Sequence, residues 1–471
     1  MNTTTTSYNP PLYYAVLCVW AISLVGLLFF VDQSSFSSIA VFYTAAFAAY
    51  YYFIRHKLVY PNPHNILLFA AVAIRIISVF AFPALSDDIY RFVWDGSLAV
   101  GGYHPFEHLP SFYLEAGNQV DGVTQELFDQ LNSQNYYTIY PTISQWVFTF
   151  SAWLFPDSIW GFSLSMKGIL ALMDIGSILV IRQILLKMDM NMDRVLLYAL
   201  NPLVIIEICG NGHFEGAMIF FMILSIFFFV KDQDSIWNLI LSALFLAAAV
   251  ASKMLPLMFL PLLLAIIPWK KALKYYVFTG IWLVVLFAPM LSSTLIAHLG
   301  ESLNLYFQKF EFNASIYYII RWIGYQVKGW NIIQDAGPML GLTVFLAIWI
   351  LTYFNNVKNK SWSSKDGWPR LAMWALTIYL AFATIVHPWY ITTLVALSIF
   401  TSYRFPLLWS GLITMTYINY SYEVYTENLW VVGLEYLLVF GMLIFEIKKY
   451  NFTKKDMLSG ESSFKVKATN S

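Results

Sequence analysis

Residues 70–96 read AAVAIRIISVFAFPALSDDIYRFVWDG, and this stretch decides the class of fold. Its first part, 70–85, is apolar apart from Arg75 and Ser78. The second part, 86–96, gathers three aspartates and an arginine. An apolar run that ends abruptly in charge is typical of a transmembrane helix reaching the membrane surface. The stretch therefore indicates a membrane protein with a polar site at one face.

The whole composition agrees with this interpretation. The chain has 471 residues, of which 59% are hydrophobic and only 11% charged, against roughly 25% charged in soluble domains. Apolar runs recur along it, which predicts an all-α polytopic membrane protein of about 12–14 transmembrane helices. The expected spans are 12–31, 37–54, 65–83, 160–182, 194–210, 214–230, 235–251, 254–269, 274–291, 338–354, 370–386, 388–403, 405–420 and 428–447.

Composition also excludes several classes of function. The two cysteines, Cys18 and Cys209, fall inside apolar runs, so the sequence predicts neither a disulfide framework nor a zinc site. The net charge is zero and no basic patch suggests a nucleic-acid partner. No Lys or Arg precedes the first apolar run, which favours a retained helix over a cleaved signal peptide.

Positive charge orients the predicted spans. Of the 27 Lys and Arg residues, 20 fall on one side of them, and the positive-inside rule makes this side cytoplasmic. The C-terminal tail, 448–471, is polar and lies on the same side. The 20 residues are Arg55, Lys57, Arg182, Lys187, Arg194, Lys231, Lys270, Lys271, Lys274, Lys358, Lys360, Lys365, Arg370, Arg404, Lys448, Lys449, Lys454, Lys455, Lys465 and Lys467.

Two long loops then face the outside, 84–159 and 292–337. The piece YPTISQWVFTFSAWLF at 140–155 is apolar enough to cross, but crossing there would put the Lys270–Lys274 cluster outside. We therefore expect an interfacial helix at 140–155, and another interfacial region in the aromatic loop 292–337. Because no linker rich in Gly, Pro or Ser interrupts the chain, residues 1–447 are expected to form one transmembrane domain.

The charged stretch at 86–96 has two interpretations. In a helix, Asp87, Arg91 and Asp95 form one stripe at i, i+4 and i+8, with Ser86 as a plausible N-cap. Such a stripe can simply cap and stabilise an interfacial helix, and these residues alone favour that interpretation. Alternatively, one aspartate faces a cavity as a general base, with Arg91 keeping it ionised.

A second polar cluster occurs in NPLVIIEICGNGHFEG, residues 201–216. Glu207, Asn211 and Glu215 are four residues apart, and His213 lies at the outward turn. A glutamate near a membrane helix end needs a partner or water. The cluster is therefore either a satisfied polar turn or part of a ligand site. His213 and Glu215 could bind a metal, but two ligands without a third are a weak signal.

Further polar groups are scattered along the outer side. Lys253 follows a predicted span, Arg321 lies in SIYYIIRWIG, and His387 opens HPWY at 387–390. Each can be a snorkelling or interfacial residue, and each can hold a lipid phosphate. Arg75 and Asp174 lie inside predicted spans, where a buried mutual pairing is the alternative to a functional role.

The shared side of these groups favours a common site. By the charge-derived topology the outer face holds Asp87, Asp88, Arg91, His213, Glu215, Lys253, Arg321 and His387. Acidic groups at the start of the long first loop, followed by basic groups, could together bind a lipid phosphate and a polar acceptor.

Several of these segments resemble a known family. SDDIYRFVWDGSLAVGGYHPF is similar to the first-loop motif of the membrane glycosyltransferases of the GT-C superfamily. YPTISQW, NPLVIIEICGNGH, SKMLPLMFLP and HPWY follow in the order found in polyprenyl-phosphate-mannose-dependent enzymes. Among eukaryotic proteins the likeness is to the first mannosyltransferase of glycosylphosphatidylinositol assembly. The resemblance covers roughly residues 65–390, and its specificity lies in the order of the motifs.

The resemblance implies an inverting transfer of a sugar, with mannose favoured, from a polyprenyl-phosphate donor to a lipid or glycan acceptor at the outer face of the plasma membrane. Asp87 best matches the catalytic aspartate and Asp88 is next, although two adjacent aspartates replace the family's spaced acidic pair. A divalent metal is compatible with the motif but not required by it. The implied substrate-binding residues are Arg91, Asp95, His213, Glu215, Lys253, Arg321 and His387.

Two other classes of function fit the same sequence features. A transporter or flippase of lipid-linked sugars would also need outer charges and a lipid groove, but no particular carboxylate. A polymerase or ligase of lipid-linked glycans would use a long outer loop with basic residues. Sugar transfer that depends on Asp87 or Asp88 separates the glycosyltransferase from the transporter.

Overall fold

The computed structural model describes residues 10–56, 63–232, 234–292, 294–298, 300–301, 309–358 and 367–465. Within these ranges the chain folds into helices joined by turns and loops, with no β-strand. One isolated parallel bridge joins Phe312 to Ile385. The expected all-α polytopic class is therefore confirmed. Of the lysines used for orientation, Lys57, Lys360, Lys365 and Lys467 lie outside the described residues.

Six helices in the described ranges are long and apolar enough to cross a membrane. Apolar side chains on their outer surfaces are exposed, as Leu172 is at 72%, which suits contact with lipid. The six helices are α1 (Pro10–Phe30), α2 (Phe36–His56), α7 (Ile159–Lys187), α12 (Trp269–Phe287, continued to Met290 by the 3₁₀ turn η6, Ala288–Met290), α15 (Ile333–Lys358) and α19 (Leu429–Lys465).

The remaining expected spans are shorter or broken. A bend of 113° separates residues 202–210 from α10 (Glu215–Lys231), and counting this pair as one span raises the number to seven. Other short apolar pieces are α3 (Pro63–Val79), α11 (Ile236–Ser252), α16 (Gly367–Phe382), α17 (Tyr390–Ser398), α18 (Phe405–Leu412) and the 3₁₀ helix η7 (Ile413–Tyr420).

Two of the expected spans have a different local structure. The region 254–269 forms two 3₁₀ helices, η4 (Leu255–Phe259) and η5 (Pro261–Ala265), because a proline in each removes a backbone donor. The region 194–210 is divided into η2 (Met192–Val195), α8 (Leu196–Ala199), α9 (Pro202–Val204) and a π-helical turn, η3 (Ile205–Gly210). Turns of this kind often mark functional sites.

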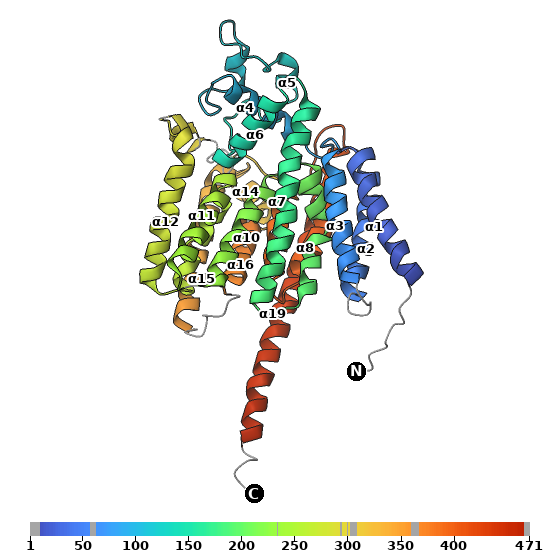
Figure 1. Cartoon of the computed structure of the whole chain (residues 1–471), viewed down its shortest axis with the longest axis vertical. Helices are drawn as coiled ribbons and strands as arrows, with labels where there is room; N and C mark the ends of the chain where they lie inside the picture. Colours follow the sequence, from blue (N-terminus) through green and yellow to red (C-terminus); the bar gives the residue numbers. More distant parts are fainter. Residues whose placement is uncertain are drawn as a thin grey trace.

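The long first loop folds into a cap over one end of the bundle, opposite the end from which α19 projects (Figure 1). It contains α4 (Asp88–Val100), η1 (Pro110–Leu114), α5 (Gln125–Asp129) and α6 (Thr142–Leu154). A separate apolar core supports it, in which the rings of Phe92 and Phe148 stack with centroids 4.6 Å apart. At 13 residues, α6 is too short to cross, as the sequence predicted.

The close packing of α4 on α6 depends on Gly96. A Cβ atom at this position would lie 2.6 Å from the backbone oxygen of Phe148, closer than real Cβ contacts. Glycine therefore lets the two helix backbones approach each other, and this approach fixes the start of α4 above the bundle.

The end of α3, which leads into Ser86, is anchored by buried polar contacts. The Arg75 guanidinium forms an ion pair of 2.6 Å with Asp174 of α7, and both side chains are 0% exposed. The Lys167 ammonium donates to the carbonyl oxygens of Ser78 and Ala81 at the last turn of α3. Arg75 and Asp174 therefore have the structural role that mutual pairing predicted.

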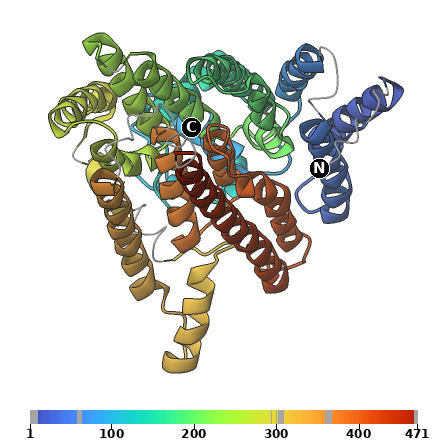
Figure 2. The same cartoon turned by 90° about the horizontal axis from the view of Figure 1, so that it is seen from below.

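Seen from below, the blue N-terminal helices lie at one edge of the bundle, and the gold, orange and red helices of the C-terminal part fill another side (Figure 2). The predicted outer loop 292–337 contains α14 (Ile316–Lys328), which extends away from the bundle, and the start of α15. Its side chains Ile319, Trp322 and Val327 are exposed. The expected polar tail continues α19 as helix as far as Lys465.

Candidate active site

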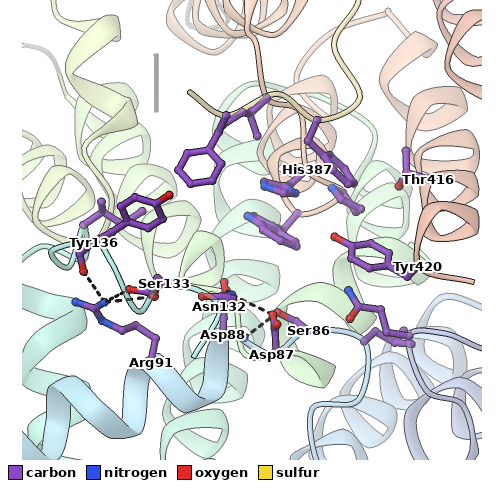
Figure 3. A pocket seen from close by; sticks show the side chains of 18 of the residues that line it. Ser86, Asp87, Asp88, Arg91, Asn132, Ser133, Tyr136, His387, Thr416 and Tyr420 are labelled. Carbon is purple, nitrogen blue, oxygen red and sulfur yellow. Dashed lines mark hydrogen bonds between the residues drawn. The ribbon is translucent and has the colours of Figure 1, made fainter. Parts of the chain in front are cut away.

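A cavity of about 640 Å³ lies where the cap meets the bundle. Its walls come from six parts of the chain: Gln33 between α1 and α2, the start of α4, the loop 132–140, the segment 310–312, the turn 385–389 and η7 with the loop after it. Figure 3 shows Asp87 and Asp88 on one side and His387 across from them. The lining is rich in aromatic side chains and has carboxylates at Asp87, Asp88 and Glu311.

The two adjacent aspartates share one amide donor. Asn132 Nδ2 donates to Asp87 Oδ1 at 3.0 Å and to Asp88 Oδ1 at 2.8 Å (Figure 3). Asp88 Oδ2 also accepts a hydrogen bond of 3.2 Å from the Tyr140 hydroxyl. The second oxygen of Asp87 has no side-chain donor among the described residues. Asp88 is therefore held from both sides, while Asp87 presents a free oxygen to the cavity.

The environment of Asp87 also changes its acidity. Although its side chain is accessible from the cavity, the surrounding protein displaces much of the bulk water, and this desolvation raises the pKa of Asp87. The negative charge of Asp88 raises this pKa further, while Asn132 and His213 oppose the rise. A carboxylate with a raised pKa is a better proton acceptor at neutral pH than an ordinary aspartate.

The predicted helix at 86–98 is present, with two differences in detail. The N-cap position is Asp87, whose side chain makes no capping bond, whereas Ser86 Oγ accepts only a long bond of 3.4 Å from the Asp88 N–H. Within the expected stripe, Arg91 Nε lies 2.9 Å from Asp95 Oδ1, but Asp87 makes no bond to Arg91.

Arg91 and Asp95 instead connect the cap. Arg91 donates to the carbonyl oxygens of Ser133 and Tyr136 at 3.2 and 2.9 Å (Figure 3). Asp95 is 0% exposed and accepts a bond of 2.9 Å from Gln145 of α6. Arg91 lines the cavity, but its guanidinium is engaged in holding the loop that carries Asn132.

The predicted His213 lies directly behind the aspartates. Its Nε2 lies 3.3 Å from Ser86 Oγ and 3.8 Å from Asp88 Oδ2. Its Nδ1 lies 3.0 Å from Glu207 Oε2, an ion-pair distance at an angle too poor for a hydrogen bond. Gly212 has φ +80°, a backbone conformation that glycine adopts without strain, and this turns His213 toward α4.

An aromatic stack joins this histidine to the HPWY turn. The rings of His213 and Trp389 stack at 3.9 Å between centroids, those of Trp389 and His387 at 4.3 Å, and those of His387 and Phe312 at 4.6 Å. Burial in this stack lowers the pKa of His387 to about 3. The ring is therefore neutral at pH 7, and its Nδ1 has no hydrogen-bond partner in the described parts of the chain.

The remaining predicted basic residues do not line the cavity. Lys253 forms an ion pair with Glu215 and lies 5.4 Å from the centroid of the Tyr390 ring. Arg321 forms an ion pair with Glu311 and covers the Tyr318 ring at 4.1 Å. Glu311 does line the cavity, so Arg321 contacts a lining residue without lining the cavity itself.

Sequence reasoning missed several residues at this site. Asn132 and Tyr140 belong to an irregular loop without helical periodicity, and Tyr417 comes from the C-terminal part of the bundle. The only available signal was the motif around YPTISQW, which begins at Tyr140.

The donor set does not fit a resident divalent metal. Among the described residues no group of three or more His, Cys, Asp or Glu side chains is placed to hold one. The position between the two aspartates, where a cation would bridge them, is taken by the Asn132 amide.

Comparison with known proteins gives one family. The family model described as alpha-(1->6)-mannopyranosyltransferase, N-terminal domain, matches residues 18–268, more than half of the chain. No curated protein and no solved structure gives a match. The matched range contains the aspartates, Glu207 and His213, and it ends just before α12. The chain therefore belongs to this MptA_B family and is a membrane mannosyltransferase of the GT-C type.

Proposed function

We propose that the protein transfers mannose from a polyprenyl-phosphate donor to a hydroxyl of a lipid or glycan acceptor outside the cytoplasm, with inversion and with Asp87 as general base. The observation that carries the proposal is the pair Asp87 and Asp88 on the wall of an aromatic cavity at the end of an apolar bundle. Aromatic walls with carboxylates suit a sugar, which offers apolar faces and hydroxyl donors.

Asp87 is the better base of the two aspartates. One of its oxygens is free of side-chain donors and its pKa is raised, so it can accept a proton near neutral pH. Asp88 accepts bonds from Asn132 and Tyr140 and has His213 beside it, so its carboxylate is less free to turn toward an acceptor hydroxyl.

The transfer is a single displacement. Asp87 accepts the proton of the acceptor hydroxyl while that oxygen forms its bond to the anomeric carbon of mannose. The bond between this carbon and the phosphate oxygen breaks, and its electron pair stays on the polyprenyl phosphate that leaves. Inversion to an α-linked product requires a β-linked donor. The alpha-(1->6) linkage that describes the family suggests a 6-hydroxyl as the acceptor group.

His387 is the residue best placed to meet the leaving phosphate. It lines the cavity across from the aspartates, and its Nδ1 lacks a partner. A neutral imidazole can donate one hydrogen bond, and a phosphate dianion beside it favours uptake of a proton. Lys253 and Arg321 are tied to Glu215 and Glu311, so they act from outside the cavity.

Purified protein tests the proposal with radiolabelled β-mannosyl phosphopolyprenol and a synthetic mannoside that has a free 6-hydroxyl. We expect an α-linked product, digestible by α-mannosidase. We expect Asp87→Asn to reduce turnover by about 100-fold or more, in the range of a general base, and Asp88→Asn to reduce it less. The Asp129→Asn variant, in α5 outside the cavity lining, is the matched control.

Three results would contradict parts of this proposal. Transfer from GDP-mannose in place of the lipid donor would overturn the donor assignment, and a β-linked product would overturn inversion. Full turnover by both aspartate variants would remove the catalytic role of the pair. Movement of the lipid-linked sugar across vesicles without any transfer would favour the transporter.

A further inference from the structure

We propose that Glu207 is a positioning residue of this active site: it keeps the His213 ring beside Asp88 and Ser86, so that Asp88 stays engaged and Asp87 is the aspartate that exchanges the acceptor proton. The inference rests on the proposed function, which makes Asp87 the base.

The first support is the line of charged groups that leads from the bundle interior to the cavity. Glu207 is 0% exposed and His213 2% exposed, so both are removed from water. The imidazole lies between two carboxylates, with Nδ1 at 3.0 Å from Glu207 and Nε2 at 3.8 Å from Asp88. Two carboxylates therefore face the ring from its two nitrogens, and Glu207 is the nearer of them.

The second support is that Glu207 cannot easily turn away. Its two oxygens accept bonds of 3.1 Å from the Tyr417 hydroxyl and 3.0 Å from Asn211 Nδ2. The backbone N–H of His213 also donates to the Glu207 carbonyl oxygen at 3.0 Å, closing the turn between them. These bonds fix the Glu207 carboxylate in the π-helical turn η3, and the His213 ring beside it stacks on Trp389.

A buried carboxylate is expensive unless a cation or several donors compensate it. Two neutral donors serve Glu207, from Tyr417 and Asn211, and the His213 ring is the third polar group beside its carboxylate. The third support is electrostatic: the Coulombic effect of His213 lowers the pKa of Asp87, against desolvation and Asp88, which raise it.

The titratable and charged groups that face this pair come from every element packed around it. Asp88 belongs to α4 and Asp87 to its N-cap position, and His387 belongs to the HPWY turn, behind Trp389. Tyr43 comes from α2, and Tyr417 and Tyr420 come from η7. Lys253, paired with Glu215, acts on the same group of rings through His387.

The test compares pH profiles of kcat/KM for Glu207→Gln and the wild type, with whichever mannosyl donor the wild type accepts. Without the Glu207 carboxylate the His213 ring is no longer held beside Asp88, so its effect of lowering the pKa of Asp87 weakens. We therefore expect the acidic limb of the profile to move to higher pH. We also expect kcat to fall about 10- to 100-fold, which is at most the loss expected on removing a general base. The KM for the donor should change less than about threefold.

Two further variants make the test specific. Glu446→Gln is the matched control, because Glu446 is also a buried glutamate, 3% exposed, but accepts from the backbone N–H groups of Arg404 and Phe405. It should leave the pH profile unchanged. The double variant Glu207→Gln with His213→Gln should be no slower than His213→Gln alone, because Glu207 acts through the ring.

The inference would be overturned if the acidic limb of Glu207→Gln were unchanged. It would also be overturned if the rate losses of Glu207→Gln and His213→Gln multiplied in the double variant. Neither result would affect the proposed mannosyl transfer. Loss of the wild-type transfer reaction itself would instead overturn the proposed function. If Glu207→Gln does not fold, Tyr417→Phe removes one bond to Glu207 and keeps its carboxylate. This variant should then show a smaller shift of the acidic limb in the same direction, and no shift would overturn the inference.

Discussion

Asn132 shows how one neutral side chain controls two charges. Its amide group donates to both aspartates and so offsets part of their mutual repulsion. Neighbouring carboxylates without such a donor favour sharing a proton. The activity of Asp87 as a base at neutral pH therefore depends on a residue that itself carries no charge.

We expect Asn132→Ala to move the acidic limb of the pH profile to higher pH, because the Asn132 bond lowers the pKa of Asp87. Activity should recover well above the new limb, since the carboxylate still ionises there. Measurement of kcat/KM across pH checks this. Asn118→Ala, which removes a bond to the Phe112 carbonyl in the same loop region, is the control and should keep the wild-type profile.

For single residues, the sequence predicted which side chains lie at the site better than it predicted the partners of those side chains. Asp87, Asp88, Arg91 and His387 do line one cavity, and His213 lies directly behind it. The partners Glu215 of Lys253 and Glu311 of Arg321 were not predicted. Ion-pair partners depend on which side chains the packed helices bring within reach, and neither periodicity nor composition carries that information.

Among the elements, α4 and α6 decide where the aspartates lie. Their backbones meet at Gly96, and the rings of Phe92, Phe148 and Phe214 fill the space beside this contact. Because Asp87 directly precedes the first residue of α4, any shift of this helix on α6 moves the base.

We therefore expect Gly96→Ala to lower the thermal unfolding midpoint of the purified protein and to reduce turnover. A Cβ atom 2.6 Å from a backbone oxygen forces the helices apart, and overpacking of this kind costs about 1–3 kcal/mol. Gly280→Ala, in α12 with nothing within 4 Å of the added atom, is the control. An equal midpoint for both variants would argue against the close-approach explanation.

Long helices were the most predictable elements. The expected spans 12–31 and 37–54 correspond to Pro10–Phe30 and Phe36–His56. The expected span 254–269 was wrong as a continuous helix, because Pro256 and Pro261 divide it into two 3₁₀ turns. Hydropathy measures how apolar a segment is and does not report where the backbone hydrogen bonds break.

For the whole molecule, the cap and the projecting end of α19 lie at opposite ends of the bundle (Figure 1). From the positive-inside rule we expect the cap to lie outside the cytoplasm. We propose that the mannosyl acceptor meets the aspartates from that side, and the prediction can be checked without any measurement of activity.

In a Cys18→Ala background, we expect a membrane-impermeant maleimide to label Ala116→Cys in intact cells and to leave Lys231→Cys unlabelled until the cells are opened. Ala116 is exposed in the cap and Lys231 ends α10 near the other end. Cys209 is 0% exposed and should not react. The reverse labelling pattern would place the cavity in the cytoplasm and contradict the proposed face.

The cavity is assembled from two halves of the chain that differ in their relation to the family. The aspartates, Asn132 and His213 lie within the matched range 18–268, whereas Phe312, His387, Trp389 and Tyr420 lie beyond it. Residues on both sides of position 268 therefore build the one cavity. We expect relatives to keep the reacting groups of the first part and to differ in acceptor choice through the residues of the second. A chimaera that takes its residues after about 268 from a relative should then adopt the acceptor preference of that relative and keep its own base.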